Sequence, residues 1–120
     1  GKLLLGVHGK WGKEGVPEAV SAVASVGVSA MFIMHTLPEE TDQGLRELRQ
    51  ATSLPIGAYA HSGDFSDPNW EFDKAMPPDE YLGHAQGWVS LGAQIVGGCC
   101  GITPDHIKEL RTKLTTRLPR

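Results

Sequence analysis

The sequence predicts an α/β domain in which helices cover a parallel sheet. Four short apolar stretches recur along the 120 residues, and each is followed by a segment with apolar residues at helical spacing. The apolar stretches alternate little with polar residues, as is typical of strands buried on both faces. Because 40% hydrophobic and 21% charged residues is an ordinary globular composition, we expect residues 1–120 to form a single domain.

The first unit opens with the apolar stretch KLLLGV and ends its strand at His8. A helix is predicted from Pro17, because proline is favoured at the first helical position and Glu18 complements the helix dipole. The apolar residues of this helix are predicted to be Val16, Ala19, Val20, Val23 and either Val26 or Gly27.

The second unit has the strand SAMFIMH, which ends at His35, and a helix predicted over residues 38–51. The third has LPIGAYAH, which ends at His61, and a helix that starts near Pro78. Residues 62–77 between them are rich in Gly, Asp, Ser, Pro and Asn, which predicts a long loop. The apolar face of the third helix is predicted to be Tyr81, Ala85, Trp88 and either Val89 or Leu91.

The fourth unit has the strand AQIVGG, which leads into Cys99 and Cys100. Its helix should begin with Thr103 as N-cap and Pro104 in the first helical position. The apolar stripe of this helix is predicted to be Ile107, Leu110 and Leu114. The histidines that fall within helices, interpreted as surface or cap residues, are His84 and His106.

The ends of the four strands carry the residues that can bind a metal. Because parallel strands all end at the same edge of a sheet, the terminal histidines and the cysteine pair should gather at one rim. These residues are His8, His35, His61, Cys99 and Cys100. For His8 and His61 taken singly, a structural role is the stronger interpretation.

The cysteine pair favours a zinc site, since thiolate and imidazole are preferred zinc ligands and a three-ligand site leaves a position open for catalysis. Gly97 and Gly98 should let the backbone bend and a substrate approach closely. The helix N-terminus at Thr103 should favour thiolate over thiol. A vicinal disulfide and two small buried apolar side chains are the alternatives for Cys99 and Cys100.

Charge and hydropathy exclude several classes of partner. The 11 basic and 14 acidic residues give a net charge of −3 without a Lys/Arg cluster, so we expect neither nucleic acid nor membrane as a partner. No apolar run approaches the roughly 20 residues of a membrane span, and no secretory leader is apparent. Two cysteines are too few for a disulfide framework. We expect a soluble cytoplasmic protein that acts on small molecules.

The stretch YLGHAQGWVSLGAQIVGGCCGITPDHIKEL, residues 81–110, closely resembles the end of the zinc-dependent homocysteine S-methyltransferase family, which has a GGCCG-T-P-x-H-I segment. LPIGAYAHSG and MHTLPEE are similar to its P-I-x-x-Y-x-N-S-G and N-C-T-x-P-E stretches. The family includes betaine-homocysteine methyltransferases and the homocysteine-binding domain of cobalamin-dependent methionine synthase. The resemblance implies four βα units equivalent to the second half of a (βα)8 TIM barrel, without the family's N-terminal D-G-x-x-G-T segment.

The resemblance also implies the site. Cys99 and Cys100 match two of the family's three zinc thiolates, and His35 stands where the third cysteine is expected. His61 stands at a family asparagine and, with Gly97 and Gly98, is predicted to contact the substrate. No catalytic residue is expected beyond the metal ligands. The implied reaction transfers a methyl group from betaine, S-methylmethionine or a methylfolate to homocysteine, giving methionine.

Two other functions remain open. The chain could be a catalytically idle zinc-binding half-barrel that acts as a scaffold or within a larger assembly. It could also be a flavodoxin-like or other open α/β domain whose cysteines are structural. The half-barrel leaves an apolar sheet face and two strand edges uncovered. We therefore expect a homodimer in which two copies complete a barrel around a two-fold axis.

Overall fold

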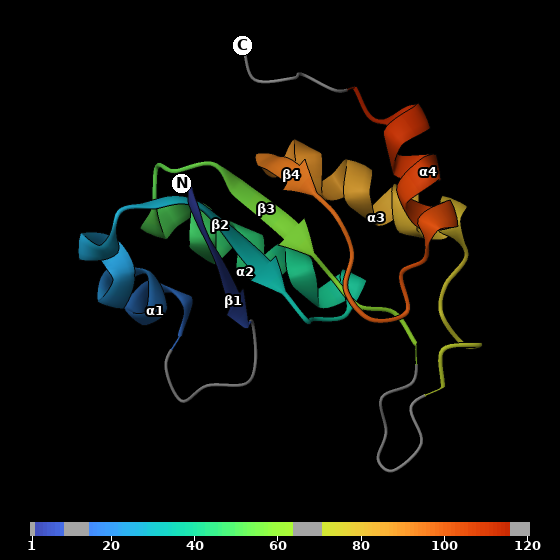
Figure 1. Cartoon of the computed structure of the whole chain (residues 1–120), viewed down its shortest axis with the longest axis horizontal. Helices are drawn as coiled ribbons and strands as arrows, with labels where there is room; N and C mark the ends of the chain where they lie inside the picture. Colours follow the sequence, from blue (N-terminus) through green and yellow to red (C-terminus); the bar gives the residue numbers. More distant parts are fainter. Residues whose placement is uncertain (1, 9–14, 64–70, 116–120) are drawn as a thin grey trace.

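Figure 1 shows the computed structural model, in which four parallel strands are each followed by a helix. The structure describes residues 2–8, 15–63 and 71–115. The elements are, in order, β1 (Leu3–His8), α1 (Val16–Val23), the 3-10 helix η1 (Ala24–Val26), β2 (Val28–Met34), α2 (Pro38–Ala51), β3 (Ile56–Tyr59), α3 (Pro78–Ser90), β4 (Ala93–Val96) and α4 (Pro104–Lys113). The four predicted strand–helix units are confirmed.

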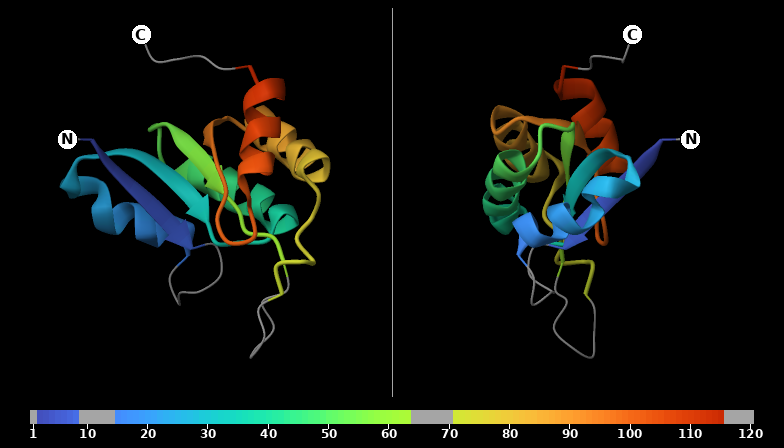
Figure 2. Two further views of the ribbon diagram at one scale, coloured as in Figure 1. Left: turned by 45° about the vertical axis from the view of Figure 1, so that its right-hand side comes forward. Right: turned by 90° about the vertical axis from the view of Figure 1, so that its left-hand side faces the viewer.

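The strands lie side by side in the order β1-β2-β3-β4, and every neighbouring pair is parallel. In a doubly wound sheet the strand order reverses at a switch point, whereas a (βα)8 barrel keeps the order of the sequence. The sheet is therefore a partial barrel, and the flavodoxin-like alternative is wrong. Helices α2 and α3 lie on the same side of the sheet, which Figure 2 shows in its right-hand view.

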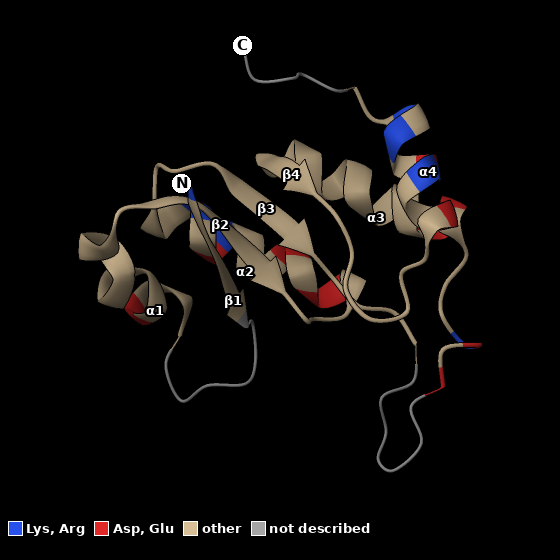
Figure 3. Ribbon diagram, viewed as in Figure 1, with Lys and Arg blue, Asp and Glu red and all other residues tan. Residues whose placement is uncertain are grey.

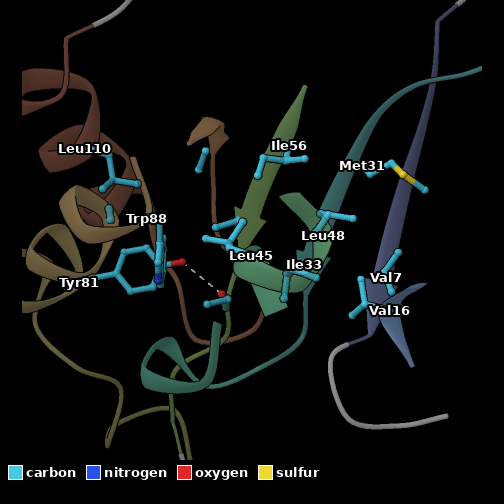
Figure 4. Packing of buried hydrophobic residues seen from close by; sticks show 14 of the residues in the cluster. Val7, Val16, Met31, Ile33, Leu45, Leu48, Ile56, Tyr81, Trp88 and Leu110 are labelled. Carbon is cyan, nitrogen blue, oxygen red and sulfur yellow. Dashed lines mark hydrogen bonds between the residues drawn. The ribbon is translucent and has the colours of Figure 1, made fainter. Parts of the chain in front are cut away.

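The core lies between the sheet and these helices. Side chains alternate along a strand, and Ile33 of β2 and Ile56 of β3 point to the helical side, where both are fully buried. They lie near Leu48 of α2, and the same buried cluster extends to Tyr81 and Trp88 of α3, as Figure 4 shows. This packing fixes the direction in which each strand ends, and so the position of the residues that follow.

The opposite face of the sheet has no helix over it among the described residues. It carries Leu4, Phe32, Tyr59 and Ile95, which we call the open face. Leu4 is 56% exposed, Tyr59 42% and Ile95 39%, and Phe32 is half-buried. In a closed barrel this face would line the interior.

Two helices differ from their predicted pattern. Helix α1 ends at Val23 and continues into η1, which ends at Gly27 with a φ of 80°, in the left-handed region that commonly ends a helix. Val26 in η1 is 59% exposed, so it is not part of the apolar face. In α4, Ile107 is 45% exposed and His106 is buried in its place. Since residues four apart share a helix face, His106 and Leu110 form the inward stripe.

Charged residues near several helix ends are opposite in sign to the partial charge of that end, as Figure 3 shows. Acidic residues occupy the first turns of α2 and α3, and Arg111 and Lys113 lie in the last turn of α4. Each arrangement places a charge where the partial charge of the helix end is opposite. In the part of the chain that the structure describes, no helix has both the length and the apolar character needed to cross a membrane.

Candidate metal centre

The candidate site lies at the rim where the parallel strands end. His35 follows β2, His61 comes two residues after β3, and Cys99 and Cys100 come shortly after β4. The backbone of His8 pairs with Met34 at the same rim, but the side chain of His8 lies outside the described residues. The predicted gathering of His35, His61 and the cysteines is confirmed.

Three of these side chains are close enough to share one ion. Ligand atoms of His35, Cys99 and Cys100 all lie within 4.8 Å of one another. The Cys99 Sγ lies 3.7 Å from His35 Nδ1 and 3.7 Å from Cys100 Sγ. In a tetrahedral zinc site with Zn–S bonds of about 2.3 Å, neighbouring ligand atoms lie about 3.8 Å apart. The two distances from Cys99 therefore match the spacing of zinc ligands. Both cysteines are free thiols, which excludes a vicinal disulfide in this structure.

The backbone at His35 is unusual. Among the described residues, His35 is the only non-glycine residue with a positive φ, 53°. Its N–H donates to the carbonyl of Tyr59 at 3.1 Å, which fixes the turn after β2 against β3. Non-glycine residues held in this region are found disproportionately at functional sites, although histidine tolerates it better than most. This turn directs the imidazole toward Cys99.

The cysteine loop is held mainly by the segment that follows β3. The Cys99 N–H donates to the Ala60 carbonyl at 2.8 Å, and the Cys100 carbonyl accepts the Ser62 N–H at 3.0 Å. Gly101 has a φ of 76°, and a Cβ there would lie 1.7 Å from the Ser62 carbonyl oxygen. Only glycine permits the loop to pass this close to residue 62.

Gly97 and Gly98 lie against the side chains of neighbouring residues. Neither has a positive φ, so the left-handed bend comes at Gly101 instead. A Cβ on Gly97 would lie 2.7 Å from the Tyr59 ring, and one on Gly98 would lie 2.2 Å from the Ile102 side chain. The two glycines therefore allow close packing of neighbouring side chains, and the substrate contact predicted for them stays a prediction.

His61 lies beside the three-residue group. Its ring meets that of His35 edge to face, with centroids 4.6 Å apart, and it is 8% exposed. The backbone N–H of His61 donates to the Thr36 carbonyl at 3.0 Å. His61 is thus packed against a candidate ligand, although it is not one of the three residues whose ligand atoms converge.

Burial dominates the electrostatics of the Cys99 thiol. It raises the pKa of the Cys99 thiol, and the neighbouring Cys100 thiol adds to this rise. This effect opposes the thiolate that the α4 dipole is expected to favour at Cys99. A metal that binds here must displace a proton from Cys99, so metal binding should depend on pH.

Two residues beneath the loop were missed as site residues by sequence reasoning. The sequence pattern predicts Tyr81 in the core, and its hydroxyl also donates to the Gly97 carbonyl at 2.8 Å. His106 was interpreted as a surface or cap residue, and it is a buried cap. The spacing of Thr103 and His106 matches that of a capping box and was the one available signal.

Comparison with known proteins shows which family this chain resembles. The family model for homocysteine S-methyltransferase matches residues 11–114. Selenocysteine Se-methyltransferase from Brassica oleracea var. italica is 28% identical over 105 residues, which cover 85% of this chain and 29% of that protein. Homocysteine S-methyltransferase YbgG from Bacillus subtilis (strain 168) is 32% identical over 89 residues, which cover 73% of this chain and 27% of that protein.

A solved structure agrees with this assignment. The homocysteine methyltransferase MmuM from Escherichia coli, in its oxidized form, superposes with a TM-score of 0.66 and 25% identity, covering 84% of this chain and 30% of that structure. The chain therefore spans less than a third of the length of these relatives. With a partial barrel, a His/Cys/Cys group at its rim and a family match over most of its length, the chain belongs to the homocysteine S-methyltransferase family.

Proposed function

We propose that this chain carries the metal-binding part of an enzyme that methylates homocysteine to methionine, with zinc bound by Cys99, Cys100 and His35. The observation that carries the proposal is the convergence of these three ligand atoms within 4.8 Å at the barrel rim. Family membership supports homocysteine as the methyl acceptor. In the reaction a bond forms between the homocysteine sulfur and the methyl carbon, the bond from that carbon to the donor breaks with its electron pair, and the thiol proton leaves to solvent.

Zinc supplies Lewis acidity, which lets a thiol react as a thiolate at neutral pH. The protein residues supply the geometry. Cys99 and Cys100 provide two anionic ligands, and three protein ligands leave a fourth position for the substrate sulfur. His35 provides a neutral ligand where the family motif has a cysteine, so the site carries one negative charge fewer. We expect a less nucleophilic sulfur, and slower methyl transfer, than three thiolates would give.

His61 and the backbone of Gly97 and Gly98 lie beside the candidate ligands. His61 packs edge to face against His35, and the half-buried backbone of Gly97 and Gly98 leads into the cysteines. We assign substrate contacts to His61, Gly97 and Gly98 within this proposal. The paired thiols also require a reducing compartment such as the cytoplasm to stay available as ligands.

The alternative is a zinc-binding half-barrel without activity, which acts as a scaffold or within a larger assembly. The specific observation in its favour is the exchange of a thiolate ligand for His35. It predicts that zinc binds but that homocysteine leaves the zinc environment unchanged. The methyltransferase proposal predicts that homocysteine adds a sulfur ligand.

The experiment measures zinc content, and then the zinc X-ray absorption spectrum with and without homocysteine. We expect about one zinc per chain, lost in Cys99→Ala and in Cys100→Ala, because removing one of three ligands removes most of the affinity. Ser53→Ala, an exposed substitution, should retain zinc. Absence of zinc from the supplemented wild-type chain would contradict the metal site, and zinc without a homocysteine response would support the scaffold.

A further inference from the structure

Helix α4 contributes a buried histidine that the proposed metal centre does not use. His106 is 4% exposed, and both of its ring nitrogens have partners. The Thr103 N–H donates to Nδ1 at 3.1 Å, and Nε2 lies 2.8 Å from the Met76 carbonyl oxygen. Because a carbonyl only accepts, Nε2 must carry the proton and donate it, and Nδ1 must accept. The ring is therefore held in one tautomer between two segments of backbone.

The hydrogen bonds continue from Met76 to the cysteine loop. The Met76 N–H donates to the Ser62 hydroxyl at 2.8 Å. The Ser62 N–H then donates to the Cys100 carbonyl at 3.0 Å. Ser62 is 3% exposed, so water does not readily replace these bonds. Three hydrogen bonds thus join His106 of α4 to the backbone of a candidate ligand.

The position of these three hydrogen bonds in the fold gives them a role beyond stability. The loop is tied to residues 60–62 at both cysteines, since the Cys99 N–H donates to Ala60 and the Cys100 carbonyl accepts from Ser62. The bond from Met76 to the Ser62 hydroxyl and the bond from His106 to Met76 fix the position of Ser62 relative to α4. They therefore also fix the bond between Ser62 and Cys100. Contacts that orient the ligands of a metal commonly change its affinity by about 10 to 100-fold when they are removed.

We propose that His106 is a positioning residue for the Cys99–Cys100 loop, acting through Met76 and Ser62, an inference that rests on the metal site proposed above. Its two nitrogens have separate tasks. Nδ1 caps α4 at Thr103, and the Nε2 proton holds Met76. The second task is the one that reaches the cysteines.

Two variants separate these tasks. In His106→Asn the side-chain oxygen can still accept from Thr103, but the amide is too short to reach Met76. In His106→Gln the longer amide can cap the helix, as in a capping box, and its NH2 group can donate to Met76. His84→Asn is the control, because His84 lies on α3 beside Trp88 and outside this hydrogen-bond chain.

The first measurement is hydrogen exchange of the Ser62 and Cys99 amides in the reduced, metal-free chain. We expect faster exchange in His106→Asn, and wild-type rates in His106→Gln and His84→Asn. The second measurement is titration with cobalt(II), whose spectrum reports thiolate ligands. We expect His106→Asn to weaken cobalt binding by about tenfold or more, and the other two variants to bind like the wild type.

Wild-type exchange in a folded His106→Asn chain would overturn the positioning role, whatever the metal does. A wild-type chain that binds no cobalt would instead contradict the proposed metal site, and the exchange rates would still decide the role of His106. If His106→Asn does not fold, Ser62→Ala removes the hydroxyl that accepts from Met76 and leaves the α4 cap intact. Unchanged cobalt affinity and unchanged Cys99 exchange in Ser62→Ala would then overturn the proposal.

Discussion

At the scale of single residues, His35 combines an unusual backbone with a candidate ligand. Its φ of 53° lies in a region that asparagine, aspartate and histidine tolerate better than other non-glycine residues. A histidine at this position therefore suits the turn as well as the proposed metal site. A cysteine there would provide the thiolate expected from the family motif but would fit the turn less well.

A cysteine at position 35 should bind zinc better but fit the turn less well, and the first prediction tests both effects. His35→Cys should raise zinc affinity by roughly tenfold or more, since changes in the contacts of a metal ligand alone have effects of that size. It should also speed any homocysteine methylation. The metal-free variant should lose up to about 1 kcal/mol of stability from the left-handed backbone. Competition with a zinc chelator and urea unfolding measure the two effects.

His35→Asn is the matched control, because asparagine fits the turn but offers a poor zinc ligand. It should fold like the wild type and lose zinc. An unchanged affinity in both His35 variants would show that His35 does not bind the metal.

The second prediction concerns Tyr81, whose hydroxyl donates to Gly97 beneath the loop. Burial raises its pKa above the usual range. Tyr81→Phe leaves the Gly97 carbonyl without this donor and should cost about 1 to 3 kcal/mol near neutral pH. Since the folded pKa is raised, this stability is fully present below the pKa of about 10 of an unfolded tyrosine and is lost as pH rises above it.

Unfolding of the wild type and Tyr81→Phe should be compared at several pH values between neutral and strongly alkaline. The difference in their free energies of unfolding should shrink as pH rises, because only the wild type has this hydroxyl to ionise on unfolding. A difference that stays constant would mean that the hydroxyl is not buried in solution as it is in the structure.

At the scale of elements, the loop between β4 and α4 is the part on which the site depends most. Its bend is placed at Gly101, where the backbone passes against Ser62. Gly27 has a similar positive φ, 80°, but a Cβ there would meet nothing within 4 Å. The two glycines therefore separate the cost of the left-handed backbone from the cost of a steric clash.

We predict that Gly27→Ala costs about 1 to 2 kcal/mol and leaves metal binding unchanged, because only the left-handed backbone is penalised. Gly101→Ala adds the clash with Ser62 and should cost more than about 3 kcal/mol or displace the loop, with loss of zinc. Thermal unfolding and zinc content measure both variants. Equal effects of the two substitutions would contradict the close approach of the loop to Ser62.

At the scale of the whole molecule, the open face and the two sheet edges decide how the chain exists in solution. Tyr59 and Ile95 on this face are large, apolar and substantially exposed. Strands β1 and β4 are edge strands whose outer backbone groups have no strand beside them among the described residues. An exposed apolar face with free edges is prone to association.

We propose a homodimer in which β1 of each copy pairs with β4 of the other. All four strands of a copy are parallel, so eight strands close as a parallel barrel if the two-fold axis runs along the barrel axis. Light scattering at micromolar concentration should give twice the mass of one chain. Burial of about 1,000 Å² of apolar surface would contribute on the order of 25 kcal/mol before the entropic costs of association.

Ile95→Asp should give a monomer, because it places a charge on the open face. Val26→Asp is the control, since Val26 is also an exposed apolar residue but lies in η1 rather than on this face. A stable monomeric wild type would contradict the homodimer.

The sequence by itself determined the elements and their order. The starts of α2 and α4 were predictable because Pro38, Thr103 and Pro104 act through preferences of the neighbouring backbone, and the strands because apolar runs mark burial. The gathering of His35 with Cys99 and Cys100 followed from the direction of parallel strands alone. These inferences needed no knowledge of how side chains pack.

Tertiary structure alone decided the geometry of the site. The 3.7 Å contact between His35 and Cys99 joins residues 64 apart in the sequence, so it depends on strand register and on the turn at His35. The inward position of His106, one residue from the predicted Ile107, depends on how α4 rotates against α3. Such rotations are set by the fit of many buried side chains at once, which local backbone preferences do not encode.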